Sequence, residues 1–478
     1  MAEIDAEGTT PGEPGPDLRT GRVSRSIPLV SMGARTGFAR AGVALTPGSR
    51  EARERRTRRY HEKTAERYAA LLGDMKGALM KAGQILSFVH VASLVPDEYQ
   101  DVYGAALEAL QADAPPMPYA AVADIIEAEL GAPPEKVFDR FSPFPIAAAS
   151  IGQVHAARLG DRELAVKVQY PGVAEAIRAD LDNTELLASL MRTGARMLPG
   201  FSTKVDFRVV AEEVRERIGE ELDYENEAAY QQEFAAIYDG HPFIRIPAVS
   251  PDLSTSRVLT MEMVDGRRFK AACESPQELR DQWGEAILRF VYGSIHRHRL
   301  FNADPHPGNY LFHEDGTVTF LDFGCVKRYT EEQERLFRLG STAILHGDAA
   351  ALHAHLVELG SLPDPNAVTP ERLWEWYQGA AEPLLGEQPY QYTREWASAE
   401  VQRQFDPFNE WKDVSRNFAI PKDVLFLSRI FVGLNSVLGI LEATCPSRGI
   451  AREIYDGAPP CSEMGRAEAE WRASTAAV

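Results

Sequence analysis

The chain has 478 residues, 44% of them hydrophobic and 25% charged, which is the composition of a soluble globular protein with more than one lobe. Its formal net charge of −19 argues against affinity for nucleic acid, whose phosphates would repel it, and no apolar run approaches the roughly 18 residues of a membrane-spanning helix. The four cysteines lie without metal-ligand spacing, which indicates a reducing compartment and, by default, the cytoplasm.

The first 60 residues divide into two parts. Residues 1–17 are acidic and rich in Gly and Pro, and they lack the basic start and apolar stretch of a secretory signal, so we expect a disordered tail. Residues 18–60 form a basic arm with eleven arginines and only two acids. This arm is either a solvated extension or a segment that attaches to an anionic membrane surface, at about 1 kcal/mol per basic residue.

Further regions are predicted from the period of the apolar residues. Residues 61–135 have helical spacing, residues 136–266 contain strand patterns, and residues 267–461 are largely helical. Residues 462–478 are expected to be a second disordered tail. Helices, then a small sheet, then helices again predict an α+β fold of two lobes with a helical extension. Within the strand-rich region we expect strands at 141–159, 164–169, 244–249 and 257–263, and helices at about 172–197 and 206–237.

The strongest chemical signal is Asn302-Ala-Asp304-Pro-His-Pro-Gly-Asn309, followed by Asp322-Phe-Gly324. Phosphoryl transfer from ATP needs a carboxylate near the attacking oxygen and two further oxygen ligands for magnesium. This spacing predicts Asp304 as the base-like residue, with Asn309 and Asp322 as ligands of Mg²⁺ or Mn²⁺. The residues between the two motifs have a hairpin pattern that turns at Asp315-Gly316, which would bring the two ligands side by side. A lone Asp-Phe-Gly is usually only a turn, but the pair at this spacing favours a site.

A second signal lies upstream, in the buried-strand pattern Ala165-Val-Lys167-Val168. It matches the strand lysine that contacts the α- and β-phosphates of ATP. An isolated strand lysine is more often a solvated edge residue, but this one lies between apolar neighbours and therefore needs a partner. The acid-rich run Glu220 to Glu227, predicted on a following helix, offers several candidates, and many acids of such a run simply face water.

An alanine-rich segment stands where a kinase carries its glycine-rich phosphate loop. Alanine methyl groups restrict the approach of backbone amides to phosphate, so the alternative is a tightly packed strand turn. The position just before Lys167 favours a modified phosphate loop. The predicted nucleotide-binding residues of this loop are Ala147, Ala148, Ala149, Ser150, Ile151, Gly152 and Gln153.

Two features of the second half concern the rest of a nucleotide site. Glu262, Met263 and Val264 have the pattern of an interlobe hinge, whose backbone groups would bind adenine. After Gly324 the chain reaches a helix start at Thr330, with neither a long activation loop nor an Ala-Pro-Glu segment. The platform on which a protein kinase holds a peptide is therefore expected to be missing.

Together these motifs resemble the UbiB-like (AarF-domain, ADCK) atypical kinases, which are associated with coenzyme Q and isoprenoid-lipid metabolism. The resemblance covers about residues 75–330 and includes Lys81-Ala-Gly-Gln84 and Glu221-Leu-Asp223-Tyr-Glu-Asn-Glu227-Ala. It implies a two-lobed protein-kinase-like fold in which helices carrying the KxGQ motif, Lys81 and Gln84, cover the active site.

The same resemblance implies roles for the acid-rich run. Glu227 becomes the ion-pair partner of Lys167, and Glu221 with Asp223 matches the regulatory ExD motif. One departure concerns Asn302, which stands where the family usually has His, so the hydrogen bonding that orients the catalytic loop is expected to differ.

We therefore expect an ATP-dependent phosphotransferase or ATPase that uses ATP or ADP with magnesium and supports prenylquinone or isoprenoid-lipid metabolism. Its expected partners are an anionic membrane surface or an isoprenoid lipid and enzymes of quinone synthesis, with peripheral membrane attachment, and generic proteins are expected to be poor substrates. The alternative is a nucleotide-responsive pseudokinase that holds a lipid or partner protein without phosphotransfer. The intact Lys167, Asp304, Asn309 and Asp322 favour the enzyme, whereas the alanine loop and the covering helices favour the binding module.

Overall fold

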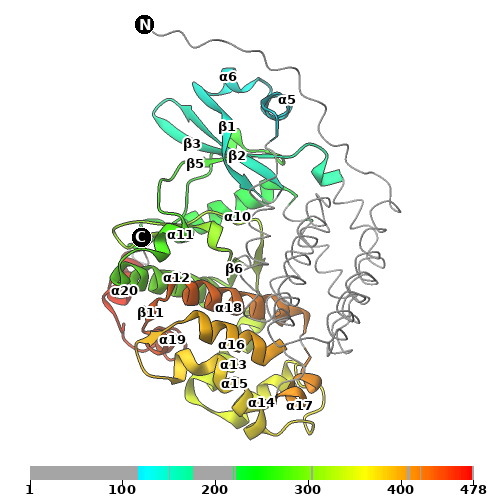
Figure 1. The fold of residues 1–478 in the computed structure, drawn as a ribbon, viewed down its shortest axis with the longest axis vertical. Helices are drawn as coiled ribbons and strands as arrows, with labels where there is room; N and C mark the ends of the chain where they lie inside the picture. The colour runs from blue at the N-terminus through cyan, green and yellow to red at the C-terminus, as the bar shows by residue number, and fades with distance from the viewer. Residues whose placement is uncertain are drawn as a thin grey trace, which may run out of the picture.

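The protein is described by a computed structural model that covers residues 117–149, 151–175, 219, 222–302, 305–405, 410–419 and 421–475 (Figure 1). The basic arm, the segment of the KxGQ motif with Lys81 and Gln84 that was predicted to be helical, and Ser150, Glu221 and Asp304 lie outside these residues. Within the described part of the chain, no helix combines the length and the apolar character needed to cross a bilayer.

The N-terminal lobe is an antiparallel sheet of four strands in the order β1-β2-β3-β5. Helix α5 (Tyr119–Leu130) covers one face, where it buries Val122 and Ile126 against Val166 and Val168 of β3. Alternation along the strand then directs Lys167 to the opposite face, because successive strand residues point to opposite sides. The strands are β1 (Arg140–Ala149), β2 (Gly152–Leu159), β3 (Arg162–Gln169) and β5 (Val258–Glu262), and a short helix α6 (Pro134–Val137) precedes them.

Helix α10 (Tyr224–Ile237) lies between this sheet and the helical lobe, as Figure 1 shows. It begins at Asp223, whose carboxylate accepts a hydrogen bond from the Glu225 amide at 3.0 Å and so caps the helix. The strand predicted at 244–249 is shorter than expected, since β4 is only Ile244–Arg245. Pro247 has no amide hydrogen for a strand ladder, and its carbonyl accepts from the Gln231 side chain at 2.7 Å instead.

The C-terminal lobe carries two small sheets beside a long helix. Strands β7 (Tyr310–Phe312) and β8 (Val318–Phe320) form the predicted hairpin, which β4 joins in the order β4-β8-β7, and β6 (Leu300–Asn302) pairs with β9 (Val326–Arg328). The turn lies where the sequence predicted it: Gly316 has a φ of 83°, and Asp315 Oδ1 accepts from the Thr317 amide at 2.9 Å.

Helix α12 (Gln277–His298) runs through the core of this lobe and buries Trp283, Ile287 and Phe290. Helix α13 (Glu331–His346) begins at Thr330, as predicted, with a capping box formed by Thr330 and Gln333. The other elements are α11 (Phe269–Cys273), α14 (Ala349–Glu358), α15 (Pro370–Leu385), α16 (Arg394–Phe405), α17 (Lys412–Asn417), α18 (Lys422–Leu441), α19 (Ser447–Tyr455), the strands β10 (Tyr390–Gln391) and β11 (Thr444–Cys445), and the 3₁₀ turns Pro251–Leu253 and Pro307–Asn309.

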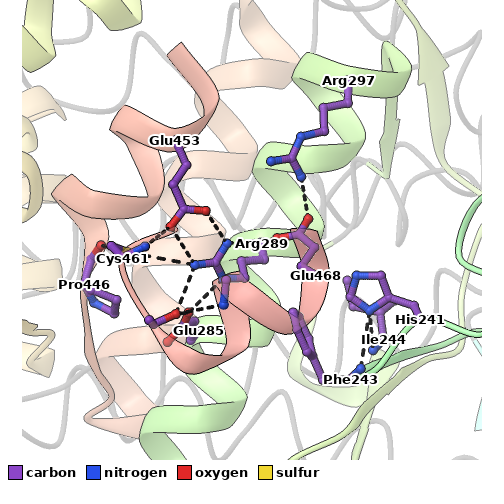
Figure 2. A network of polar contacts seen from close by, with 12 residues as sticks. His241, Phe243, Ile244, Glu285, Arg289, Arg297, Pro446, Glu453, Cys461 and Glu468 are labelled. Atoms are coloured by element: carbon purple, nitrogen blue, oxygen red, sulfur yellow. Dashed lines mark hydrogen bonds and ion pairs between the residues drawn. The ribbon is translucent and has the colours of Figure 1, made fainter. Parts of the chain in front are cut away.

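The prediction of a disordered tail over 462–478 is wrong. Helix α20 (Glu463–Thr475) occupies most of it, and Glu468 on this helix is only 3% exposed. The reason is a contact that no local pattern reveals: the carboxylate of Glu468 binds the guanidinium groups of Arg289 and Arg297 on α12 (Figure 2). The α+β layout with a strand-rich first lobe and a helical second lobe is confirmed.

Candidate active site

The centre of the candidate site is an ion pair between the two lobes. Lys167 Nζ lies 2.7 Å and 2.8 Å from the two carboxylate oxygens of Glu227, and both residues are buried, with exposed fractions of 8% and 2%. The ammonium group also lies 4.8 Å from the centre of the Tyr224 ring and 4.0 Å from Asp322 Oδ2. Strand β3, helix α10 and the segment after β8 therefore meet at this lysine.

The environment of Lys167 keeps it charged. Burial by itself lowers the pKa of an ammonium group, but the carboxylates of Glu227 and Asp322 outweigh that effect and raise the pKa of Lys167 above its ordinary value. Lys167 is therefore charged beside two carboxylates, and the excess negative charge of this cluster favours a cation next to Asp322.

The hairpin brings residues 309 and 322 together. The pairing of Tyr310 with Phe320 continues outward through a hydrogen bond from the Leu321 amide to the Asn309 carbonyl at 3.0 Å, so Asn309 lies opposite Leu321, the residue before Asp322. Asp322 Oδ1 accepts from the Gly324 amide at 2.9 Å, and its side chain is 32% exposed. Carboxylate and amide oxygens are suitable magnesium ligands, and ATP phosphates would complete the shell.

Two contacts that the sequence analysis did not predict hold the segment of Asp322. The side-chain amide of Asn302 donates to the backbone carbonyl of Asp322 at 2.6 Å. The residue that replaces the family histidine therefore holds this segment by a hydrogen bond. The ring of Phe323 is fully buried and lies 4.8 Å from the ring of Phe234 on α10. The Asp-Phe-Gly motif is therefore fixed to the helix that carries Glu227.

The alanine-rich segment differs from an open loop. Residues 147–149 belong to β1 and pair with Val154, Gln153 and Gly152 of β2, so the three alanines are strand residues. Ile151 is buried, and the Gln153 side chain is hydrogen-bonded to the Met117 amide at 2.9 Å and to His155 at 2.8 Å. The side chains of Ile151 and Gln153 therefore serve the packing of the lobe, and a nucleotide contact from these two residues would have to use the backbone.

Gly152 is required by this packing. A Cβ atom at residue 152 would penetrate the backbone carbonyl of Val168 on β3 and lie 2.9 Å from the Tyr224 hydroxyl. A strand backbone cannot yield as a flexible side chain does.

We expect Gly152→Ala to lower the free energy of unfolding by about 3 kcal/mol, at the upper end of the cost of overpacking. The midpoint of urea unfolding measures this loss, and Ala148→Ser, at an exposed position of the same hairpin, serves as the control. Equal midpoints for the two variants would contradict the assigned packing role.

Two backbone amides of the predicted hinge already donate hydrogen bonds to neighbouring backbone carbonyls. The Glu262 amide donates to the Ala248 carbonyl at 2.8 Å, and the Met263 amide donates to the Glu163 carbonyl at 3.0 Å. Any adenine contact from this segment would therefore use carbonyl oxygens or the amide of Val264. Among the described residues, no group of three His, Cys, Asp or Glu side chains could hold a metal, so the predicted metal site rests on Asn309 and Asp322 together with phosphate oxygens.

Comparison with known proteins places the chain in a family. Residues 109–356, more than half of the chain, match the ABC1 atypical kinase-like domain, and the chain belongs to this family. The resemblance found in the sequence is thereby confirmed, and the two-lobed architecture is that of a kinase-like domain.

Curated relatives include atypical kinases from distant organisms. The chain is 29% identical over 402 residues to the mitochondrial atypical kinase coq-8 of Caenorhabditis elegans, covering 83% of this chain and 51% of that protein. It is 34% identical over 273 residues to the mitochondrial atypical kinase COQ8B of Rattus norvegicus, covering 57% and 49%. The chain thus spans about half the length of these curated relatives.

A solved structure matches this chain over almost its own full length. The complex of Rv3197 with erythromycin from Mycobacterium tuberculosis is 30% identical to this chain, with a TM-score of 0.59, and the match covers 84% of this chain and 98% of that one. The fold therefore matches an experimentally determined structure of comparable extent.

Proposed function

We propose that this chain is an ATP-dependent phosphotransferase or ATPase that binds a magnesium nucleotide between its lobes. The observation that supports this most directly is the buried Lys167–Glu227 pair with the carboxylate of Asp322 at 4.0 Å from the same ammonium group. A structural ion pair alone would not need a second, partly exposed carboxylate, because an excess negative charge at a buried pair costs free energy unless a cation joins it.

Each residue has a distinct part in this proposal. Lys167 binds phosphate oxygens and Glu227 orients it, while Asn309 and Asp322 hold the metal and Asp304 accepts the proton of the attacking hydroxyl or water. Asn302 keeps Asp322 in place through the backbone hydrogen bond at 2.6 Å. Phosphoryl transfer depends mainly on such positioning and on electrostatic stabilisation, which these few groups can supply.

The proposed acceptor is a small or lipid-like molecule, in support of prenylquinone or isoprenoid-lipid metabolism at an anionic membrane surface. The relatives COQ8B and coq-8, which are named as mitochondrial atypical kinases, support the kinase part of this assignment, and the resemblance of the motifs to the UbiB-like family supports the part that concerns quinone and isoprenoid lipids. Generic proteins should be poor substrates, because β9 and the start of α13 follow Gly324 within a few residues and leave no long segment to hold a peptide. Labelled-phosphate transfer to casein by the wild-type protein would contradict this part.

Nucleotide binding should depend on a divalent cation. At a nucleotide concentration a hundred times the dissociation constant, Mg-ATP should stabilise the folded protein by about 2.7 kcal/mol. Thermal unfolding with ATP or ADP, with magnesium, manganese or EDTA, measures the shift and also compares the two nucleotides. A shift that persists unchanged in EDTA would count against Asn309 and Asp322 as metal ligands.

A second candidate is a binding module that responds to nucleotide without phosphotransfer. It is favoured by the closed hairpin at Ile151 and Gln153, and by the fact that the related Rv3197 was solved with erythromycin, a large ligand that is not a nucleotide. ATP turnover, measured with and without anionic vesicles that contain a quinone precursor analogue, separates the two. Magnesium-dependent binding with no turnover under any of these conditions would favour the binding module.

A further inference from the structure

The C-terminal helix α20 joins α12, in the core of the helical lobe, to α10, which carries Glu227 of the candidate site. On one side, Glu468 accepts hydrogen bonds from Arg289 Nη1 at 2.9 Å and from Arg297, both on α12. On the other side, the indole N–H of Trp471 donates to the backbone carbonyl of Asp239 at 2.9 Å, directly after the end of α10. Helix α20 therefore ties the C-terminal end of α10 to α12.

The attachment to α12 is strong because it is buried. Arg289 is 1% exposed, and its guanidinium group lies 2.7 Å from Glu285, 2.8 Å from Glu453 and 2.9 Å from Glu468. Figure 2 draws this network. Buried guanidinium–carboxylate hydrogen bonds have fixed geometry, since an unpaired member would leave a charge without water. Glu468 consequently sets where α20 lies along α12.

Helix α20 contacts the end of α10 through aromatic rings. The Trp471 ring is stacked on Tyr238 at 6.4 Å and meets the edge of His241 at 4.4 Å. Tyr238 is also anchored to α12, through its hydroxyl and Ser294 Oγ at 2.7 Å. Burial, together with the nearby charges of Arg297 and Arg289, lowers the pKa of His241 to about 3, so its ring stays neutral and accepts from the Ile244 amide at 3.1 Å.

A rigid helix carries this constraint to the ion pair. Glu227 lies on α10, and the same helix contacts Phe323 of the Asp-Phe-Gly motif through Phe234. A helix transmits a shift at one end to the other, since its backbone hydrogen bonds resist local deformation over three turns. A displacement at Tyr238 would move Glu227 relative to Lys167 on β3.

We propose that Trp471 and Glu468 are positioning residues, through which the C-terminal helix α20 holds α10 in the place where Glu227 pairs with Lys167. The effect on turnover rests on the proposed function, whereas the effect on the ion pair does not. Trp471 itself touches neither nucleotide nor metal in this assignment.

The test is the chemical reactivity of Lys167 in the full chain. Limited acetylation with acetic anhydride, followed by mass spectrometry, compares Lys167 with the exposed Lys136 in the same molecule. A buried, charged lysine reacts slowly, and loss of its carboxylate partner both lowers its pKa and opens it to reagent. Trp471→Ala should therefore raise the labelling of Lys167 several-fold relative to Lys136, and Trp471→Phe, which keeps the ring but loses the N–H, should raise it less.

Three control variants separate positioning from general loss of stability. Glu470→Ala, at an exposed position of α20, should label as the wild type does. Leu373→Ala creates a cavity in the separate core beneath α14 and α15 and should lower the melting temperature without raising the labelling of Lys167. Glu227→Gln removes the partner and should raise the labelling most.

The outcomes are distinct. Labelling of Lys167 in Trp471→Ala that equals the labelling in Glu470→Ala or Leu373→Ala would overturn the proposal, as would unchanged labelling in Glu227→Gln. ATP turnover measured on the same samples should fall about tenfold in Trp471→Ala, because small displacements of catalytic groups lower the rate. If labelling follows the prediction but no variant, including the wild type, turns over ATP, then the proposed function fails and the positioning role stands.

Discussion

Replacing Asp322 with asparagine should lower ATP turnover by about a hundredfold or more, while the melting temperature without ligand stays near that of the wild type. The carboxylate lies 4.0 Å from Lys167 and its side chain is 32% exposed, so a metal ion can reach it from solvent. The amide that replaces it keeps the shape of the side chain and an oxygen that can accept from the Gly324 amide. The substitution removes the negative charge and one acceptor oxygen, and that charge is what holds a divalent cation against the phosphates.

The same substitution leaves the ion pair intact, because Glu227 remains 2.7 Å from Lys167 and keeps the ammonium group charged. Asp252→Asn, at an exposed carboxylate away from the site, is the matched control and should retain full turnover. Turnover of Asp322→Asn close to that of Asp252→Asn would remove Asp322 from the metal site. Isothermal titration with Mg-ATP should show weakened binding in the first variant alone.

Replacing Arg289 with methionine should lower the free energy of unfolding by about 3–5 kcal/mol, the cost of leaving buried carboxylates without their partner. Methionine fills much of the volume, so the loss reflects charge rather than a cavity. The guanidinium group binds Glu285, Glu453 and Glu468 from three helices, and all three acids are at most 10% exposed at their side chains. Denaturant unfolding of the full chain measures the difference.

The difference in the free energy of unfolding between Arg289→Met and the wild type should also depend on pH, in a direction set by Glu453. Burial raises the pKa of Glu453, but hydrogen bonds from Arg289 and the Cys461 amide outweigh it, and the pKa lies below its ordinary 4.5. A lowered carboxylate pKa adds stability above pH 4.5, and that stability is lost as the pH falls through the pKa of the folded protein. Without Arg289, burial dominates and the pKa of Glu453 rises, so the difference between variant and wild type should narrow on acidification.

Arg335→Met is the control, since Arg335 pairs with Glu332 on the exposed surface of α13. Exposed ion pairs contribute little, so its unfolding midpoint should match the wild type. An Arg289→Met protein as stable as Arg335→Met at neutral pH would show that the buried cluster does not hold α20 in place.

Short-range patterns in the sequence were enough for much of the candidate site. The hairpin that turns at Asp315-Gly316 and the capped helix that begins at Thr330 depend on residues within a few positions of each other, and both are present. The hairpin places Asn309 beside Asp322 because strand pairing propagates from its turn. The requirement that Lys167 have a partner also followed from the sequence, since a lysine between apolar strand residues cannot remain unpaired.

The identity of that partner did not follow from local pattern. Several acids of the run before Ala228 were equivalent candidates, and it was the family resemblance, together with the structure, that singled out Glu227. The replacement of the family histidine by Asn302 was visible in the sequence, but its hydrogen bond to the Asp322 carbonyl depends on where the fold places β6 relative to the segment that follows β8. The alanine-rich segment was ambiguous for the same reason, because pairing in the sheet decided that residues 147–149 are strand.

The sequence by itself determined the α+β layout, the kinase-like motifs and the elements built from neighbouring residues. Only the tertiary structure decided whether the last residues are ordered. Their polar, charged composition predicted disorder, but they form helix α20. Glu468 and Arg289 are 179 positions apart, and Trp471 meets Asp239 across 232 positions. Whether a charged side chain is solvated or buried depends on the partner that folding brings to it, and no periodicity along the chain contains that information.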